Sequence, residues 1–164
     1  MSLEIGGRAD KIGNQYENRF LAKLLIRLME ERLTSIEVEP LGDEGKGVEY
    51  IVETPAGKRI FYQCKASNGA QNKWSIADLD GLKIFRNAKT HILADRHNEF
   101  HFISPLPYDG LEDLCERART NHNPQDFIAY QLTNKPLRNL FADPAAQQGE
   151  MKGIYSFCKF FFVF

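Results

Sequence analysis

Glu49, Gln63 and Lys65 carry a carboxylate, an amide and an ammonium group at positions that a β-hairpin can bring together. Carboxylate and amide oxygens are ligands that Mg²⁺ accepts, usually with few protein ligands and several waters. A lysine beside such an ion can orient or deprotonate water, or stabilise negative charge on a reacting phosphate. These groups could therefore hydrolyse a phosphodiester. A Gln-x-Lys pair alone is common on solvated strand faces, so the fold must bring all three together.

The stretches 47–54 and 58–66 both have the composition of strands, and Pro-Ala-Gly at 55–57 joins them. Proline suits the first central position of a type I turn, and glycine suits a following left-handed residue. This combination predicts a three-residue hairpin loop with a bulge at the glycine.

The loop length fixes the register of the hairpin. It pairs Thr54 with Lys58 and, counting back, Glu49 with Gln63. Lys65 lies two residues beyond Gln63 and is therefore expected on the same face. A loop shorter by one residue would divide the three polar groups between the two faces.

Glu17 lies within the strongest helical pattern, over 9–31, for which Asp10 is a candidate N-cap. It falls near the middle of an apolar stripe, where a carboxylate is costly unless it is paired or bound to a metal. The alternatives are an edge position from which the side chain reaches water, and a buried partner for Lys65. The stripe consists of Ile12, Tyr16, Phe20, Leu21, Leu24, Leu25, Leu28 and Met29.

Glu17 on a first helix, Glu49 on a strand, and Gln63-Cys64-Lys65 on the next strand resemble the PD-(D/E)xK nuclease superfamily. The similarity is to its Mrr-like and double-stranded-DNA-nuclease branches, in which Gln replaces the second acidic residue.

The resemblance covers roughly residues 6–105 and implies an α/β fold: a restriction-endonuclease-like mixed β-sheet flanked by helices. It implies that Glu49 and the Gln63 oxygen hold Mg²⁺ or Mn²⁺, and that Lys65 assists the attacking water. The Cys64 carbonyl and Glu17 are candidate further ligands. The chain departs from the family at Glu49, where the usual residue is Asp.

Three residues are candidate contacts to double-stranded DNA. Lys73 and Trp74 follow the second strand of the hairpin, where the resembled nucleases often contact DNA, and Lys11 lies on the first helix. A single Trp before a helix is more often a core anchor.

The remaining pattern completes an α/β layer with a mixed sheet. Ser75 with Asp78 resembles a capping box. The expected elements are a strand at 36–38, a helix at 76–87, strands at 91–94 and 100–104, and helices at 111–119, 126–132 and 136–141.

We expect one domain over 1–164, with a nuclease-like core at about 6–105 and a helical part at about 106–145. The apolar tail over 149–164 predicts a buried strand, a dimer contact, or the end of a chain that originally continued. Similar nuclease domains commonly precede an ATPase or sensor domain, so a downstream domain of that kind is one expectation.

Composition restricts the cellular setting. The formal net charge of −1 argues against a strong independent nucleic-acid binder. Three cysteines without CxxC spacing predict a reducing cytoplasm rather than a disulfide framework or zinc site. No segment predicts a signal peptide or a membrane span.

Together these observations predict a metal-dependent DNA endonuclease of low sequence specificity in prokaryotic defence, and homodimerisation would suit the cutting of two strands. Two rival interpretations remain open. The first is a catalytically inactive nuclease-like module that binds DNA or protein, with Glu49 in place of Asp as its mark. The second is an unrelated α/β interaction domain in which Glu17 and Lys65 form a buried ion pair.

Overall fold

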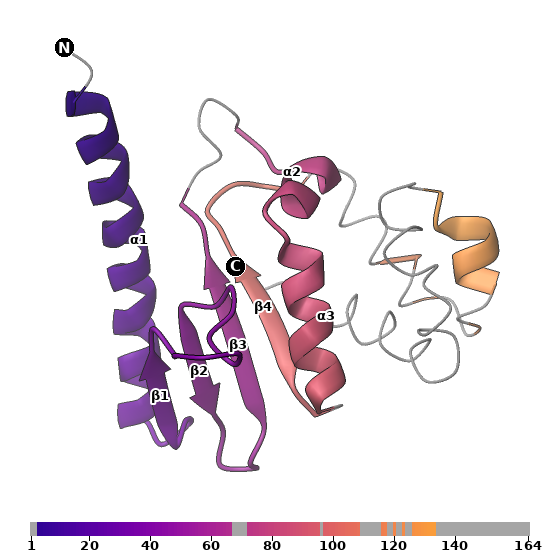
Figure 1. Cartoon of the computed structure of the whole chain (residues 1–164). Coiled ribbons are helices and arrows are strands. Elements are labelled where there is room, and N and C mark those ends of the chain that lie inside the picture. Colours follow the sequence, from indigo (N-terminus) through magenta and orange to yellow (C-terminus); the bar gives the residue numbers. More distant parts are fainter. Residues whose placement is uncertain are drawn as a thin grey trace.

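A four-stranded mixed sheet forms the centre of the protein, with helices on both faces (Figure 1). The computed structural model describes residues 3–66, 72–95, 97–108, 116, 117, 120, 123 and 126–133, without the side chains of 3–14, 128 and 131. The elements are α1 (Leu3–Met29), β1 (Ser35–Val38), β2 (Tyr50–Glu53), β3 (Arg59–Cys64), α2 (Ile76–Gly81), α3 (Ile84–Ala94), β4 (Glu99–Ile103) and the π-helical η1 (Phe127–Gln131).

The strands lie in the order β1-β2-β3-β4, and the predicted α/β class with a mixed sheet is confirmed. The first three strands are antiparallel neighbours, whereas β4 runs parallel to β3. A parallel neighbour requires a crossover connection, which α2 and α3 provide between β3 and β4.

The predicted hairpin turn is correct. The amide of Thr54 donates to the carbonyl of Lys58 over 2.9 Å, and Gly57 has a φ of +74°. Tyr50 then pairs with Tyr62, in the register that the loop length predicts.

Helix α1 starts at Leu3, earlier than predicted, so Asp10 lies inside the helix and is not its cap. Its predicted apolar stripe is confirmed in part. Leu25 and Met29 are exposed, because the sheet covers a narrower arc of the helix than the stripe spans. The stripe residues that pack on the sheet are Tyr16, Phe20, Leu21, Leu24 and Leu28.

The predicted capping box is present, since Ser75 and Asp78 exchange side-chain and backbone hydrogen bonds at the start of α2. The helix predicted over 76–87 is wrong, because Lys83 adopts a left-handed conformation (φ +61°) that separates α2 from α3. The strand predicted over 91–94 is also wrong, since α3 continues to Ala94. The residues that α3 buries have helical spacing: Ile84, Phe85, Ala88, His91 and Ile92.

The sheet separates two apolar cores. One face packs against α1 through Tyr50, Val52, Ile60 and Tyr62, among others. The opposite face packs against α2, α3 and η1, where the buried residues are Val48, Ile51, Phe61, Trp74, Leu79, Ile84, Phe85, Ala88, Ile92, Phe100, Phe102, Phe127 and Leu132.

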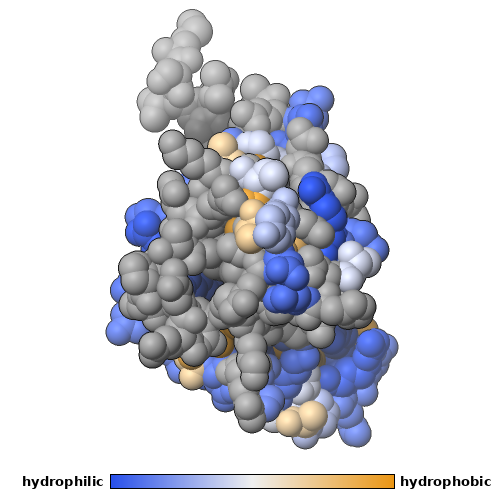
Figure 2. Space-filling view, turned by 90° about the vertical axis from the view of Figure 1, so that its right-hand side faces the viewer, coloured by the Kyte–Doolittle hydropathy of each residue, from blue (hydrophilic) through white to orange (hydrophobic). Residues whose placement is uncertain are grey.

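Figure 2 shows the side of the molecule at the right of Figure 1, where the described residues are mostly hydrophilic, with small scattered hydrophobic areas. Element η1 confirms a helical segment within the predicted range 126–132. The predicted helix over 136–141 and the tail over 149–164 lie outside the described residues, as does most of the predicted helix over 111–119. Among the described helices, none combines the length and apolarity needed to cross a bilayer.

A buried polar cluster lies on the α1-facing side of β4. Alternation along the strand places Glu99 and His101 on the same face as Ile103. His101 Nε2 donates to Glu99 over 3.1 Å, and the Lys58 ammonium forms an ion pair with the same carboxylate. Burial raises the pKa of Glu99, but the hydrogen bonds from His101 and Lys58 outweigh it and hold the pKa below its ordinary value.

We expect Glu99→Gln to destabilise the fold by about 1–3 kcal/mol at neutral pH, the range for a hydrogen bond to a charged group. Because the folded-state pKa is lowered, this stability is present above the ordinary pKa of 4.5 and is lost as the pH falls below it. Urea denaturation at pH 7 and pH 4 should therefore show a smaller difference between wild type and variant at pH 4. Glu37→Gln, on the exposed edge of β1, is the control. A constant difference at both pH values would contradict the prediction.

Candidate active site

Glu49 precedes β2 and interrupts the regular ladder. The hairpin register would pair it with Gln63, but its amide instead donates to the carbonyl of Tyr62 over 2.9 Å. This irregularity is of the kind that a β-bulge introduces, and such a bulge changes where a side chain points. Val48 therefore packs into the core beside α2 and α3, whereas Glu49 faces the side of α1.

The preceding turn depends on a glycine for this path. Gly47 has a φ of +69°, and a Cβ at this position would lie 1.9 Å from Nδ2 of Asn87 on α3. A side chain at position 47 would thus be strained and would collide with α3. The turn before Glu49 therefore packs closely against the Asn87 side chain of α3.

The Glu49 carboxylate is held by the end of β3. Oε2 accepts a hydrogen bond from the Cys64 amide over 2.6 Å, and Oε1 accepts one from Nζ of Lys65 over 3.2 Å. Lys65 follows the last residue of β3, and its side chain reaches Glu49 on the α1 side. The structure therefore brings together two of the three residues predicted to act jointly.

Gln63 lies on the opposite face of the sheet. It is 5% exposed, and its Oε1 accepts from Nδ2 of Asn87 over 3.5 Å. Phe61, two residues earlier on the same face, belongs to the core beside α3. The expectation that Glu49, Gln63 and Lys65 share one face is wrong, because the irregularity at Glu49 turns its side chain away from Gln63.

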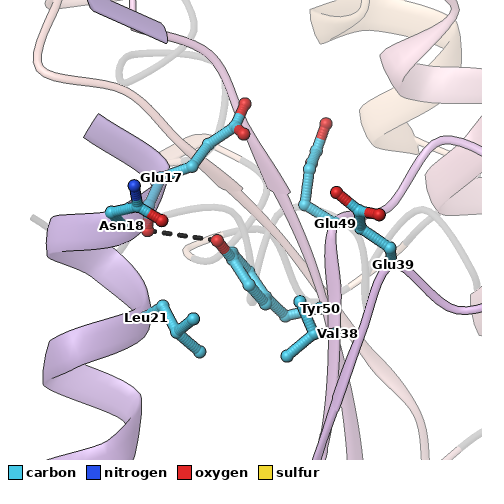
Figure 3. A pocket seen from close by; sticks show the side chains of 7 residues that line it. All are labelled: Glu17, Asn18, Leu21, Val38, Glu39, Glu49 and Tyr50. Carbon is cyan, nitrogen blue, oxygen red and sulfur yellow. Dashed lines mark hydrogen bonds between the residues drawn. The ribbon is translucent and has the colours of Figure 1, made fainter. Parts of the chain in front are cut away.

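A pocket of about 260 Å³ opens between α1 and the adjoining ends of β1 and β2 (Figure 3). The carboxylates of Glu17, Glu39 and Glu49 gather at one end of it. The Tyr50 hydroxyl donates to the Glu17 carbonyl over 3.1 Å and ties α1 to β2. The lining residues are Glu17, Asn18, Leu21, Val38, Glu39, Glu49 and Tyr50.

Sequence analysis did not identify Glu39 as a site residue. Its φ is +49°, and its amide donates to the Glu49 carbonyl over 2.9 Å, so the chain leaves β1 through a bend directly beside Glu49. The one signal in the sequence is the following Pro40, which predicts the end of the strand but not the direction of the preceding side chain.

The charged form of Glu17 is destabilised, as its position in an apolar stripe predicts. Its pKa is raised, first by burial and second by the neighbouring Glu49 carboxylate, while Lys65 acts in the opposite sense. The ion pair of Lys65 is with Glu49. The buried Glu17–Lys65 ion pair expected for an unrelated α/β interaction domain is therefore not formed among the described residues.

Cys64 contributes backbone groups rather than a thiolate. Its side chain is fully buried, and burial is the main cause that raises its pKa, so the sulfur stays a neutral thiol. Its amide is already bound to Glu49.

Of the predicted ligand side chains, the pocket brings together the carboxylates of Glu17 and Glu49. Within the part of the chain that the structure describes, no three His, Cys, Asp or Glu side chains are grouped closely enough to hold a metal by themselves. Mg²⁺ commonly keeps several waters and binds through one or two carboxylates, and a cation between two carboxylates relieves their repulsion. Gln63 does not fit as a ligand in this arrangement, because its amide contacts Asn87 across the sheet.

The predicted DNA-contacting residues differ in accessibility. Trp74 is 1% exposed, and its Nε1 donates to Oγ of Ser104 over 2.7 Å, which confirms the alternative of a core anchor. Trp74 is thus not available to stack on a base. Lys73 is exposed beside it, and the side chain of Lys11 lies outside what the structure describes.

Comparison with known proteins gives no match for this chain among family models, curated proteins or solved structures.

We expect Glu17→Gln to raise the melting temperature at neutral pH in the presence of EDTA. A carboxyl group whose folded-state pKa is raised stabilises the fold below its unfolded-state pKa, and this contribution is lost as the pH rises through the folded-state value. Removing the charge should raise the melting temperature by up to about 3 °C, since 1 kcal/mol corresponds to about 2–4 °C in a domain of this size.

The wild type and Glu17→Gln also test whether Glu17 takes part in binding Mg²⁺. Millimolar Mg²⁺ should raise the melting temperature of the wild type, because a ligand that binds only the folded state stabilises it, and should have less effect on Glu17→Gln. Scanning fluorimetry with and without Mg²⁺ measures both effects. An equal Mg²⁺-induced shift in the two proteins would remove Glu17 from the metal site.

Proposed function

We propose that this protein is a metal-dependent deoxyribonuclease that hydrolyses phosphodiester bonds in double-stranded DNA. The observation that carries the proposal is the acidic pocket whose Glu49 is hydrogen-bonded to Lys65. The fold supports it at a coarser level, since the chain forms a four-stranded mixed sheet with helices, an α/β architecture. Low sequence specificity, a role in prokaryotic defence and a restriction-endonuclease-like fold are parts of the same proposal.

Glu17 and Glu49 would hold Mg²⁺ or Mn²⁺ at the acidic end of the pocket. Such an ion supplies a more acidic bound water and neutralises the charge on the phosphate oxygens. The Cys64 amide holds Oε2 of Glu49. Oε1, which accepts a hydrogen bond from Lys65 in the structure, would then be available to bind the cation.

Lys65 would act on the water and the phosphate. Its ammonium neutralises Glu49 in the structure, so a cation bound by that carboxylate would release Lys65 toward the substrate. There it would orient the attacking water and stabilise the negative charge of the transition state. The backbone of Lys65 stays in place, because its amide donates to the carbonyl of Ile103 on β4 over 2.9 Å.

A second candidate function is supported by a different observation. Both oxygens of Glu49 have protein partners, and Gln63 is turned toward Asn87. In this arrangement Glu49 ties the start of β2 to the end of β3. A nuclease-like domain without catalytic activity that binds DNA or protein would have this geometry.

The test is cleavage of supercoiled plasmid by the purified protein in Mg²⁺ or Mn²⁺. We expect Lys65→Ala and Glu49→Gln each to reduce the cleavage rate by at least about 100-fold, the lower end of the range for acid–base catalysis. Lys46→Ala is the matched control, because Lys46 forms an exposed ion pair with Asp43 and its ammonium has no role in the proposal.

The possible results separate the two candidates. Cleavage that is lost in both site variants and retained in Lys46→Ala supports the nuclease. Equal residual cleavage in all four proteins indicates contamination, and DNA binding without metal-dependent cleavage favours the inactive module. Single-stranded DNA and RNA in parallel reactions define the substrate class.

A further inference from the structure

Helix α1 has a second apolar face, directed away from the sheet. Its members are Ala22, Leu25, Ile26 and Met29, hereafter the outer stripe. The three large side chains are 46%, 55% and 84% exposed, respectively. The opposite face of the same turns is the one buried on the sheet, through Leu24 and Leu28.

The spacing of the outer stripe is i, i+3, i+4, i+7, which is the spacing of residues that line one side of a helix. Four neighbouring apolar groups therefore form one continuous surface over two turns. The other exposed large hydrophobic residues of the described part of the chain come from separate elements. They are Val38, Leu41, Leu82, Leu93 and Tyr130.

We propose that the outer stripe is the contact surface for a second copy of this chain, with the two α1 helices antiparallel about a two-fold axis near Ile26. A two-fold contact is self-complementary, so one apolar stripe serves as both halves of the interface. This proposal does not depend on the nuclease proposal.

The charges beside the stripe favour the antiparallel arrangement. Lys23 and Glu30 are both exposed and lie on the same flank of the stripe, two turns apart. Two helices that pair antiparallel bring the same flank of each copy together, whereas parallel helices bring opposite flanks together. The antiparallel pair thus places Lys23 of each copy near Glu30 of the other, forming two ion pairs.

Among the described side chains, Glu30 forms an ion pair with Arg32, which does not compete strongly for it. The two groups are 3.5 Å apart and both side chains are exposed. An exposed ion pair of this kind contributes little to stability, so Glu30 can exchange partners at little cost.

The size of the stripe predicts the strength of association. Stable interfaces bury about 1,200–2,000 Å² in total, and two helical turns from each copy supply less. We therefore expect a weak dimer with a dissociation constant in the micromolar range or above, which forms when the local concentration is high.

Sedimentation velocity of the full chain over a concentration series tests the proposal. The wild type should shift reversibly from monomer to dimer, and the double variant Leu25→Asp/Ile26→Asp should stay monomeric at the highest concentration. Leu93→Asp is the matched control, since Leu93 is an equally exposed leucine on α3. Circular dichroism and melting temperature identify any variant that fails to fold.

A charge exchange tests the orientation. Lys23→Glu should weaken the dimer about 10-fold by placing two glutamates together, and Lys23→Glu with Glu30→Lys should restore it. The restoring variant keeps the apolar stripe, so this comparison does not depend on the aspartate variants folding. A monomeric wild type at millimolar concentration overturns the proposal. A dimer that persists in the double aspartate variant, or that Leu93→Asp abolishes, overturns it as well.

Discussion

The hydrogen bond from the Cys64 amide to the Glu49 carboxylate is the constraint on which the candidate site depends. It joins the residue before β2 to the last residue of β3, and it places the carboxylate at the entrance of the pocket beside α1. Lys65 follows directly, so the same strand end that anchors Glu49 also delivers its counter-charge. A backbone amide cannot move independently of the sheet. The position of the carboxylate is therefore a property of the fold rather than of a flexible side chain.

The pocket that Glu49 enters is acidic, and the negative charges within it repel one another. Glu49 is held near α1, and the Tyr50 hydroxyl ties the backbone of α1 to β2 at the Glu17 carbonyl. The pKa of Glu17 is raised by burial and by the neighbouring Glu49 carboxylate. Strain of this kind is typical of functional sites, where the fold tolerates an arrangement that a ligand relieves.

Much of the fold could be predicted from local rules, because each depends on residues close together in the sequence. The turn at Gly57 sets the register of β2 and β3, and Ser75 with Asp78 caps α2. The face of Glu49 could not be predicted. It depends on one irregular hydrogen bond to Tyr62, and a single such step reverses the direction of a side chain. The bend at Glu39 depends in the same way on a long-range hydrogen bond, from its amide to the Glu49 carbonyl.

The two sides of helix α1 have different roles. The inner side supplies Glu17 to the pocket and Leu24 to the core, and the outer side exposes Ile26 and Met29 to water. A helix that is apolar on both sides is normally buried on both sides. Packing of a second copy on the outer side would bury Ile26 without altering the pocket, because Glu17 faces the sheet. The proposed self-association and the proposed metal binding would therefore use different sides of one helix, and each could be removed without the other.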